Sequence, residues 1–176
     1  MNERVFDPKN SLVEDGVLDN EWRAFVGEAS DYYIKNWESV DTPSKSIGWN
    51  WASFLGNLFW MGYRKMYNEA VLTLLLLFSI NTVELRFKVN DMIGGLIIWA
   101  FLICCGLYGN AIYYNFARRK ILKTKSHYTG DDMTKVLNKS GGASWVGVWM
   151  MIFITFAFSY VIYQLLPWFG IDKKLF

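Results

Sequence analysis

Long uninterrupted runs of apolar side chains dominate the pattern of this chain and predict its membrane segments. Residues 92–114 carry no charge, and at about 1.5 Å of rise per residue a helix of this length crosses a hydrocarbon core of roughly 30 Å. Residues 144–168 are also uncharged, and Trp145, Trp149 and Trp168 lie near the ends of this run, as in the aromatic belts of membrane proteins. We therefore predict spans at about 92–115 and 144–168.

The apolar region before residue 84 leaves two interpretations open. Residues 49–61 and 70–83 are apolar, but the segment between them carries Arg64 and Lys65, which are costly at the centre of a bilayer. We expect an interfacial or re-entrant aromatic helix at 49–62 and one span at about 66–83. In the alternative, both apolar pieces cross the membrane, which gives four spans instead of three.

The polar N-terminal region contains one amphipathic helix pattern, between residues 18 and 40, after an expected extended or poorly ordered arm at 1–17. Apolar side chains recur every three or four positions, and Asp19 or Asn20 can cap the helix. Its apolar face can pack on the membrane domain, lie at the lipid headgroups or recruit a protein. The candidate partner surface consists of four aromatic residues, Trp22, Phe25, Tyr33 and Trp37.

Charge divides the chain at residue 47 and predicts its orientation. Residues 1–47 carry ten acidic and five basic side chains, whereas residues 48–176 carry six acidic and thirteen basic ones. Seven of the thirteen lie in the loop 116–143, and basic loops stay in the cytoplasm. Within this loop, a short helix is expected, capped by Thr129 or Asp131 and ended by Gly141 and Gly142. We therefore expect a cytoplasmic acidic region at 1–47, a helical membrane domain at 48–176 and a cytoplasmic basic loop at 116–143.

These elements predict an all-α fold. We expect a polytopic membrane protein with about three transmembrane helices, an interfacial or re-entrant aromatic helix and an N-terminal amphipathic helix.

Residues that build catalytic or metal sites are scarce. His127 is the only histidine, and the adjacent Cys104 and Cys105 lack the spacing of a zinc or redox motif, so we interpret them as small buried residues. No nucleotide-binding or nucleophile motif is present, and we predict no catalytic residue, cofactor, metal or nucleic-acid partner. Gly106, Gly109 and Asn110 are candidate helix-packing residues, because glycines let helices approach closely.

Several motifs are similar to those of a bacterial membrane family. The run GWNWASFL at 48–55, followed by LFW at 58–60 and YRKMY at 63–67, resembles the signature of domain of unknown function 2628. Gly48 departs from the more usual Phe of this family, and Ala143 replaces a Thr. The resemblance covers about residues 22–150. It implies a small multi-pass protein of the bacterial inner (cytoplasmic) membrane and supplies no established activity.

The same signature supplies a candidate membrane anchor or ligand groove. Its aromatic side chains would form a girdle, and its two basic side chains would extend to the cytoplasmic headgroups. The residues are Trp49, Trp51, Trp60, Tyr63, Arg64, Lys65 and Tyr67.

Two classes of function remain open from the sequence. The first is a non-enzymatic inner-membrane protein that binds another membrane or exported protein, as a complex subunit, an accessory protein or an immunity-type protein. The alternative is a lipid- or small-solute-binding membrane protein associated with transport. The expected partners are membrane lipids and another membrane or secreted protein, and the oligomeric state is left open.

Overall fold

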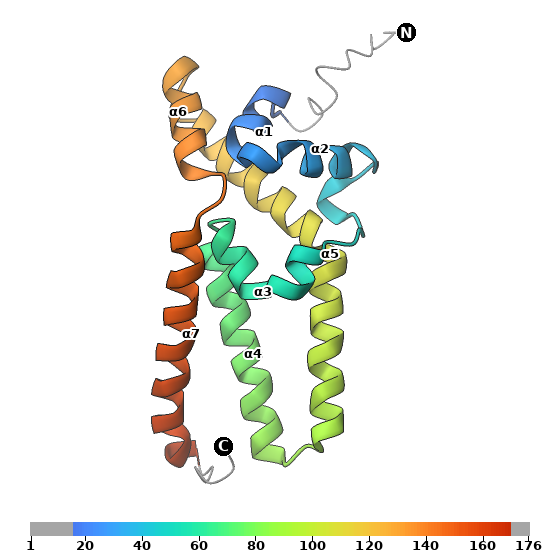
Figure 1. Ribbon diagram of the computed structural model, residues 1–176, viewed down its shortest axis with the longest axis vertical. Helices are drawn as coiled ribbons and strands as arrows, with labels where there is room; N and C mark the ends of the chain where they lie inside the picture. Colours follow the sequence, from blue (N-terminus) through green and yellow to red (C-terminus); the bar gives the residue numbers. More distant parts are fainter. Residues whose placement is uncertain (1–15, 170–176) are drawn as a thin grey trace. The chain divides into compact units, whose positions relative to one another are not determined.

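The computed structural model describes residues 16–169, and all regular secondary structure in this range is helical (Figure 1), which confirms the all-α prediction. The predicted arm at 1–17 lies outside the described residues except for its last two. The elements are α1 (Asp19–Val26), η2 (Gly27–Ala29), α2 (Ser30–Glu38), η3 (Pro43–Lys45), α3 (Trp51–Tyr63), α4 (Tyr67–Phe87), α5 (Asp91–Lys125), α6 (Gly130–Ser140), α7 (Trp145–Leu165) and η4 (Leu166–Phe169).

Three helices within residues 16–169 are long and apolar enough to cross a membrane, namely α4, α5 and α7. They coincide with the three predicted spans, which confirms the prediction of about three helices able to cross a membrane. Helix α3 has only 13 residues, too few for an upright crossing. Helix α5 has 35 residues, because the apolar run continues into the basic segment without a glycine or proline that would end it.

The chain divides into two compact units. The head unit comprises Met1–Asn50 and Leu107–Ala143, and the span unit comprises Trp51–Gly106 and Ser144–Phe176. This division differs from the predicted boundary at residue 47, since the basic loop groups with the N-terminal region instead of with the spans. The reason is that the second part of α5 carries aromatic side chains on which the N-terminal helices pack.

The amphipathic segment of the head unit is two helices instead of the single one predicted. Gly27 breaks it with a φ of 74°, and a Cβ at this residue would lie 3.4 Å from the Cα of Gly142. The predicted cap was also wrong, because Leu18 occupies the N-cap position of α1. The carboxylate of Glu21 reaches back and accepts the Leu18 N–H at 2.8 Å, so Asp19 is already helical.

An aromatic core joins α1 and α2 to the second part of α5 in the head unit. The Trp22 and Tyr114 rings stack with centroids 5.1 Å apart, and the Tyr33 and Tyr113 centroids lie 4.6 Å apart. Trp37 adds an edge contact to Tyr114 at 5.3 Å. All five side chains are at most 2% exposed. The apolar face of the N-terminal segment therefore packs on α5.

Helix α6 closes the head unit much as its capping residues predict. Thr129 occupies the N-cap position and Gly141 the C-cap position. The Gly142 N–H donates to the Phe25 carbonyl oxygen at 2.7 Å, and a Cβ at Gly141 would collide with the same carbonyl group. A glycine is required at residue 141 because the two backbones touch there.

The span unit contains α3, α4, the first part of α5 and α7. Helix α3 meets α7 at a pair of glycines, where a Cβ at Gly62 would lie 2.7 Å from the carbonyl oxygen of Gly147. The Ser144 N–H also donates to the Tyr63 carbonyl oxygen at 2.8 Å. Close backbone contact of this kind is typical of helices packed in a membrane.

Helix α3 contains a non-helical residue at its centre. Asn57 has a φ of 38° and a ψ of −112°, although it is not a glycine. Its side chain is 8% exposed, and neither its oxygen nor its nitrogen has a hydrogen-bond partner. This residue therefore combines backbone strain with an unsatisfied buried amide.

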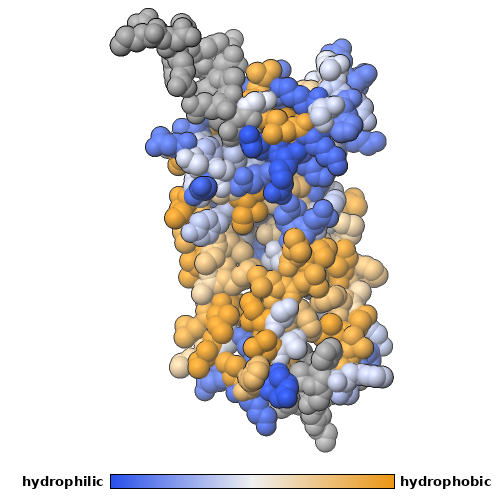
Figure 2. Space-filling model, turned by 180° about the vertical axis from the view of Figure 1, so that it is seen from behind, coloured by the Kyte–Doolittle hydropathy of each residue, from blue (hydrophilic) through white to orange (hydrophobic). Residues whose placement is uncertain are grey.

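Many apolar side chains of the span unit are exposed at its surface. Trp51, Trp145 and Trp149 are 64–70% exposed, and Figure 2 shows hydrophobic residues over much of the visible surface of the apolar helices. Large exposed apolar areas are unusual in water but normal in lipid.

Candidate functional site

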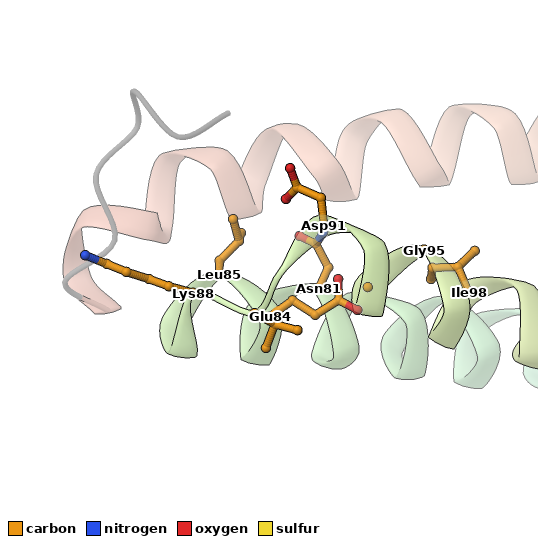
Figure 3. A pocket seen from close by; sticks show the side chains of 9 residues that line it. Asn81, Glu84, Leu85, Lys88, Asp91, Gly95 and Ile98 are labelled. Carbon is orange, nitrogen blue, oxygen red and sulfur yellow. The ribbon is translucent and has the colours of Figure 1, made fainter.

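A cavity of about 580 Å³ lies beside the turn that joins α4 to α5 in the span unit (Figure 3). Its volume is in the range of small-molecule sites, roughly 300–1,000 Å³. The cavity is lined by charged, amide and aliphatic side chains and by two glycines. The lining residues are Asn81, Glu84, Leu85, Lys88, Val89, Asp91, Gly94, Gly95 and Ile98.

Local sequence explains why the chain turns sharply here. Lys88 ends α4 in the left-handed region with a φ of 51°, and the Val89 N–H donates to the Glu84 carbonyl oxygen at 2.9 Å. The Asn90 side chain then accepts the Met92 N–H at 2.9 Å, which is the geometry of an N-cap at the start of α5. The last turn of α4 and the first turns of α5 therefore enclose the same space.

The Glu84 carboxylate is the most buried charged group of this cavity. Its Oε1 atom is buried and has no hydrogen-bond partner. A Cβ at Gly94 would lie 3.3 Å from both carboxylate oxygens, so the missing side chain leaves the room that the carboxylate occupies. Gly95 is different, because a Cβ there would meet nothing within 4 Å.

The arrangement provides groups that are suited to binding a ligand. Carboxylate and amide oxygens accept hydrogen bonds, and the aliphatic walls suit a short apolar chain. Within residues 16–169, no three His, Cys, Asp or Glu side chains are grouped so that they could hold a metal ion.

A serine and a histidine do lie together elsewhere, in the head unit. The Ser126 Oγ atom is 2.8 Å from His127 Nδ1, but both residues are exposed. Among residues 16–169, no carboxylate is hydrogen-bonded to this histidine, so the orienting group of a triad is missing.

The predicted anchor or groove residues take several positions instead of lining one groove. Trp49 belongs to the head unit, whereas the other six belong to the span unit. Trp51 is 64% exposed, but Trp60 is 5% exposed. Tyr63 packs edge-on against Trp145, with ring centroids 5.4 Å apart. The set therefore mixes exposed, half-buried and buried side chains instead of presenting one exposed aromatic surface.

The basic pair of the signature forms the turn between α3 and α4. Lys65 has a φ of 58°, and its N–H donates to the Gly62 carbonyl oxygen at 3.0 Å. Arg64 is only 7% exposed, and its guanidinium lies 5.7 Å from the Tyr63 ring centroid. The predicted extension of Arg64 to headgroups is therefore wrong for this conformation, since the turn folds its side chain inward. Tyr67 begins α4 directly after this turn.

The four residues predicted as a partner surface are core residues. Trp22, Phe25 and Trp37 are 0% exposed and Tyr33 is 2% exposed. The prediction is corrected because the same aromatic face that could recruit a protein is covered by α5 within the head unit.

The predicted helix-packing residues lie on α5, where all three are buried. The Asn50 amide donates to Asn110 Oδ1 at 2.8 Å, and the Trp37 indole N–H donates to the Asn110 carbonyl oxygen at 3.1 Å. Gly109 comes directly before Asn110 and belongs to the head unit as well, whereas Gly106 belongs to the span unit. Of the two cysteines, Cys105 is buried as expected but Cys104 is exposed, and both are free thiols.

The cavity was missed in the sequence because its parts fall on both sides of a predicted span boundary. The span was predicted to end at residue 83, one residue before Glu84, and the pair Gly94–Gly95 was interpreted as a helix contact. The available signal was the combination of an acid in the last turns of one helix and two glycines in the first turn of the next.

Comparison with known proteins gives one match. Residues 11–119, more than half of the chain, match the family described as "Protein of unknown function (DUF2628)". The family match confirms the resemblance carried by the 48–67 signature, but it ends at residue 119 and does not extend over the last part of the expected range 22–150. No curated protein and no solved structure matches.

Proposed function

The chain belongs to this family of unknown function, and we propose that it is a non-enzymatic membrane protein that binds a lipid headgroup or a small solute in the cavity beside the α4–α5 turn. The observation that supports this proposal most directly is a cavity of ligand size that contains a buried carboxylate oxygen without a partner. Such an oxygen is costly to leave unpaired, which favours a site completed by a ligand.

We further propose a location in the bacterial inner membrane, with the N-terminal region and the 116–143 loop in the cytoplasm. The distribution of basic side chains supports this orientation. The α4–α5 turn carries only Arg86 and Lys88 as basic residues and would lie on the opposite side. The cavity would then receive its ligand from the outer leaflet or from the space beyond it.

Binding of a protein partner stays a prediction from the sequence. The residues proposed for it lie in the core of the head unit and offer no surface. The lipid or solute alternative is therefore preferred, with its site at the α4–α5 turn instead of at the aromatic girdle.

A pocket-filling variant tests the proposal. In Gly95→Trp, the indole enters open space, because a Cβ at this position meets no atom within 4 Å. Leu96→Trp is the matched control, since Leu96 is 62% exposed and does not line the cavity. Native mass spectrometry of protein purified in a mild detergent should find the same bound small molecule on the wild type and on Leu96→Trp, and none on Gly95→Trp. Identical spectra for all three proteins would reject the proposed function.

A further inference from the structure

The ligand class of the cavity can be taken one step further, on the basis of the proposed function. We propose that the Glu84 carboxylate binds a primary ammonium group, with a short alkyl chain of the ligand against the aliphatic wall. The ammonium group can belong to a phosphatidylethanolamine headgroup or to a free amine, and the experiment below separates these two sources.

The first argument is that Glu84 lacks a cation within residues 16–169. Its Oε1 atom is buried without a hydrogen-bond partner, and no described basic side chain pairs with it. Lys88 is only four residues further along, but Figure 3 shows its side chain extending away from the Glu84 carboxylate. Glu84 as a whole is half-buried, but its Oε1 atom is shielded from water and would be satisfied by a positive partner, for which the cavity beside it has room.

The second argument is that the site is built around this carboxylate. Gly94 is buried, and both Glu84 oxygens lie where its side chain would begin to crowd them, at 3.3 Å from the position of a Cβ. The first turn of α5 therefore accommodates a charged group from α4 that a larger residue would displace.

The third argument selects an ammonium group over a metal ion. The second carboxylate of the cavity, that of Asp91, points in another direction in Figure 3, so the two acids do not converge on one point. Divalent cations require several converging oxygen ligands, whereas an ammonium group needs only three acceptors and tolerates apolar neighbours. Leu85, Val89 and Ile98 provide those neighbours.

The test uses full-length protein in nanodiscs of two compositions. The first contains phosphatidylglycerol alone and is titrated with ethanolamine, and the second contains phosphatidylethanolamine and phosphatidylglycerol. Lys173 and Lys174, which lie outside the described residues, are replaced by Gln in every protein, so that the comparison does not depend on their ammonium groups. Bound amine or lipid is counted by native mass spectrometry.

We expect binding in at least one composition, and Glu84→Gln should weaken it by at least about tenfold. Asp131→Asn, which removes the same charge from an exposed position on α6, should leave it unchanged. Binding confined to the first composition identifies a free amine, and binding confined to the second identifies the lipid headgroup.

A stability measurement separates a binding role from a structural one. Without an amine, Glu84→Gln should unfold at the same temperature as the parent protein or at a higher one, because it removes a half-buried charge whose Oε1 atom has no partner. A clearly lower unfolding temperature would show that Glu84 stabilises the fold and would overturn the inference.

The remaining outcomes distinguish the inference from the proposed function. If Gly95→Trp abolishes binding but Glu84→Gln does not, the ammonium assignment is wrong and the cavity remains a binding site. If a bound molecule is retained from cells but neither nanodisc composition supplies it, the ligand is not an amine of this class. If nothing binds to the wild type in either experiment, both the proposed function and the ammonium assignment are rejected.

Discussion

Aromatic side chains have opposite surroundings in the two units of this protein. In the head unit, Trp22 and Trp37 are 0% exposed, whereas in the span unit Trp145, Trp149 and Trp168 are 69–87% exposed. Water drives apolar rings into a core, but lipid offers them surroundings as apolar as a core. Aromatic content in a sequence therefore does not reveal whether a residue is core, membrane surface or partner surface.

The units also differ in how their helices are joined. Ring contacts connect α1 and α2 to α5 in the head unit, whereas two touching glycines connect α3 to α7 in the span unit. Without a hydrophobic force between helices, close backbone approach becomes the main source of attraction in a membrane. The following predictions test this contrast.

The largest effect is expected from truncating a tryptophan in the head unit. Trp37→Ala removes a fully buried ring and the 3.1 Å hydrogen bond to the Asn110 carbonyl oxygen, and should lower the free energy of unfolding by about 3–5 kcal/mol. Trp149→Ala, in the span unit, should change it by less than about 1 kcal/mol. Chemical unfolding in detergent micelles, followed by circular dichroism, measures both. Equal losses would contradict the contrast between the units.

A smaller loss is expected from adding a methyl group where α3 meets α7. Gly147→Ala places a Cβ against the Gly62 carbonyl group, which should destabilise the protein by about 1–3 kcal/mol. Gly95→Ala is the control, because its Cβ meets no atom and alanine favours a helix by about 0.5–1 kcal/mol. The same unfolding measurement applies, and a Gly147→Ala protein as stable as Gly95→Ala would show that the backbones do not touch.

The sequence was sufficient to predict the helices but not the residues at which they are interrupted. Apolar length alone located α5 and α7, since a membrane span needs about 20 apolar residues, whereas α4 was located with the help of the charged pair Arg64 and Lys65 before it. The break at Gly27 was missed because apolar periodicity continues across it, whereas glycine is favoured there by the positive φ of 74°. A single backbone angle of this kind leaves no periodic signal.

The candidate site shows the same limit more strongly. Glu84 and Gly94 are ten residues apart, and the contact between the Glu84 carboxylate and the backbone at Gly94 depends on the left-handed turn at Lys88. A lysine is a poor signal for such a turn, because left-handed residues are usually glycine or asparagine. The sequence therefore supplied the parts of the cavity but not their juxtaposition.

The left-handed positions themselves distinguish the two units. Within residues 16–169, Gly16, Gly27, Gly130 and Gly142 adopt positive φ in the head unit, whereas Asn57, Lys65 and Lys88 do so in the span unit. The head unit thus uses the residue that tolerates this conformation, and the span unit carries strain.

Asn57→Gly should relieve that strain. The substitution permits the φ of 38° and removes an amide whose two polar atoms are buried without partners, so we expect a gain of about 1 kcal/mol in the free energy of unfolding. Asn57→Ala is the control, since it removes the amide but keeps the strain. A gain of the same size in both variants would assign the effect to the amide alone, and a loss in Asn57→Gly would contradict the prediction.

The smallest effect concerns pH and is specific to the head unit. Burial raises the pKa of Tyr32 above its ordinary value of about 10, the neighbouring Tyr33 adds to the shift, and an interaction with Asn110 opposes it. A tyrosine with a raised pKa favours folding while it is protonated in both states. Its contribution is therefore complete below about pH 10 and is lost as the pH rises through the folded-state pKa.

Tyr32→Phe isolates this contribution from the other titrating groups. The difference in the free energy of unfolding between the wild type and the variant should be constant from pH 7 to 9. Above about pH 10, the wild type should lose stability relative to the variant. The shift is small, because the Tyr32 side chain is 46% exposed and water reaches its hydroxyl group. Unfolding curves at matched ionic strength measure it. A difference that stays constant up to pH 11 would mean that Tyr32 is solvated equally in both states, and that burial in the head unit does not extend to the ring at its edge.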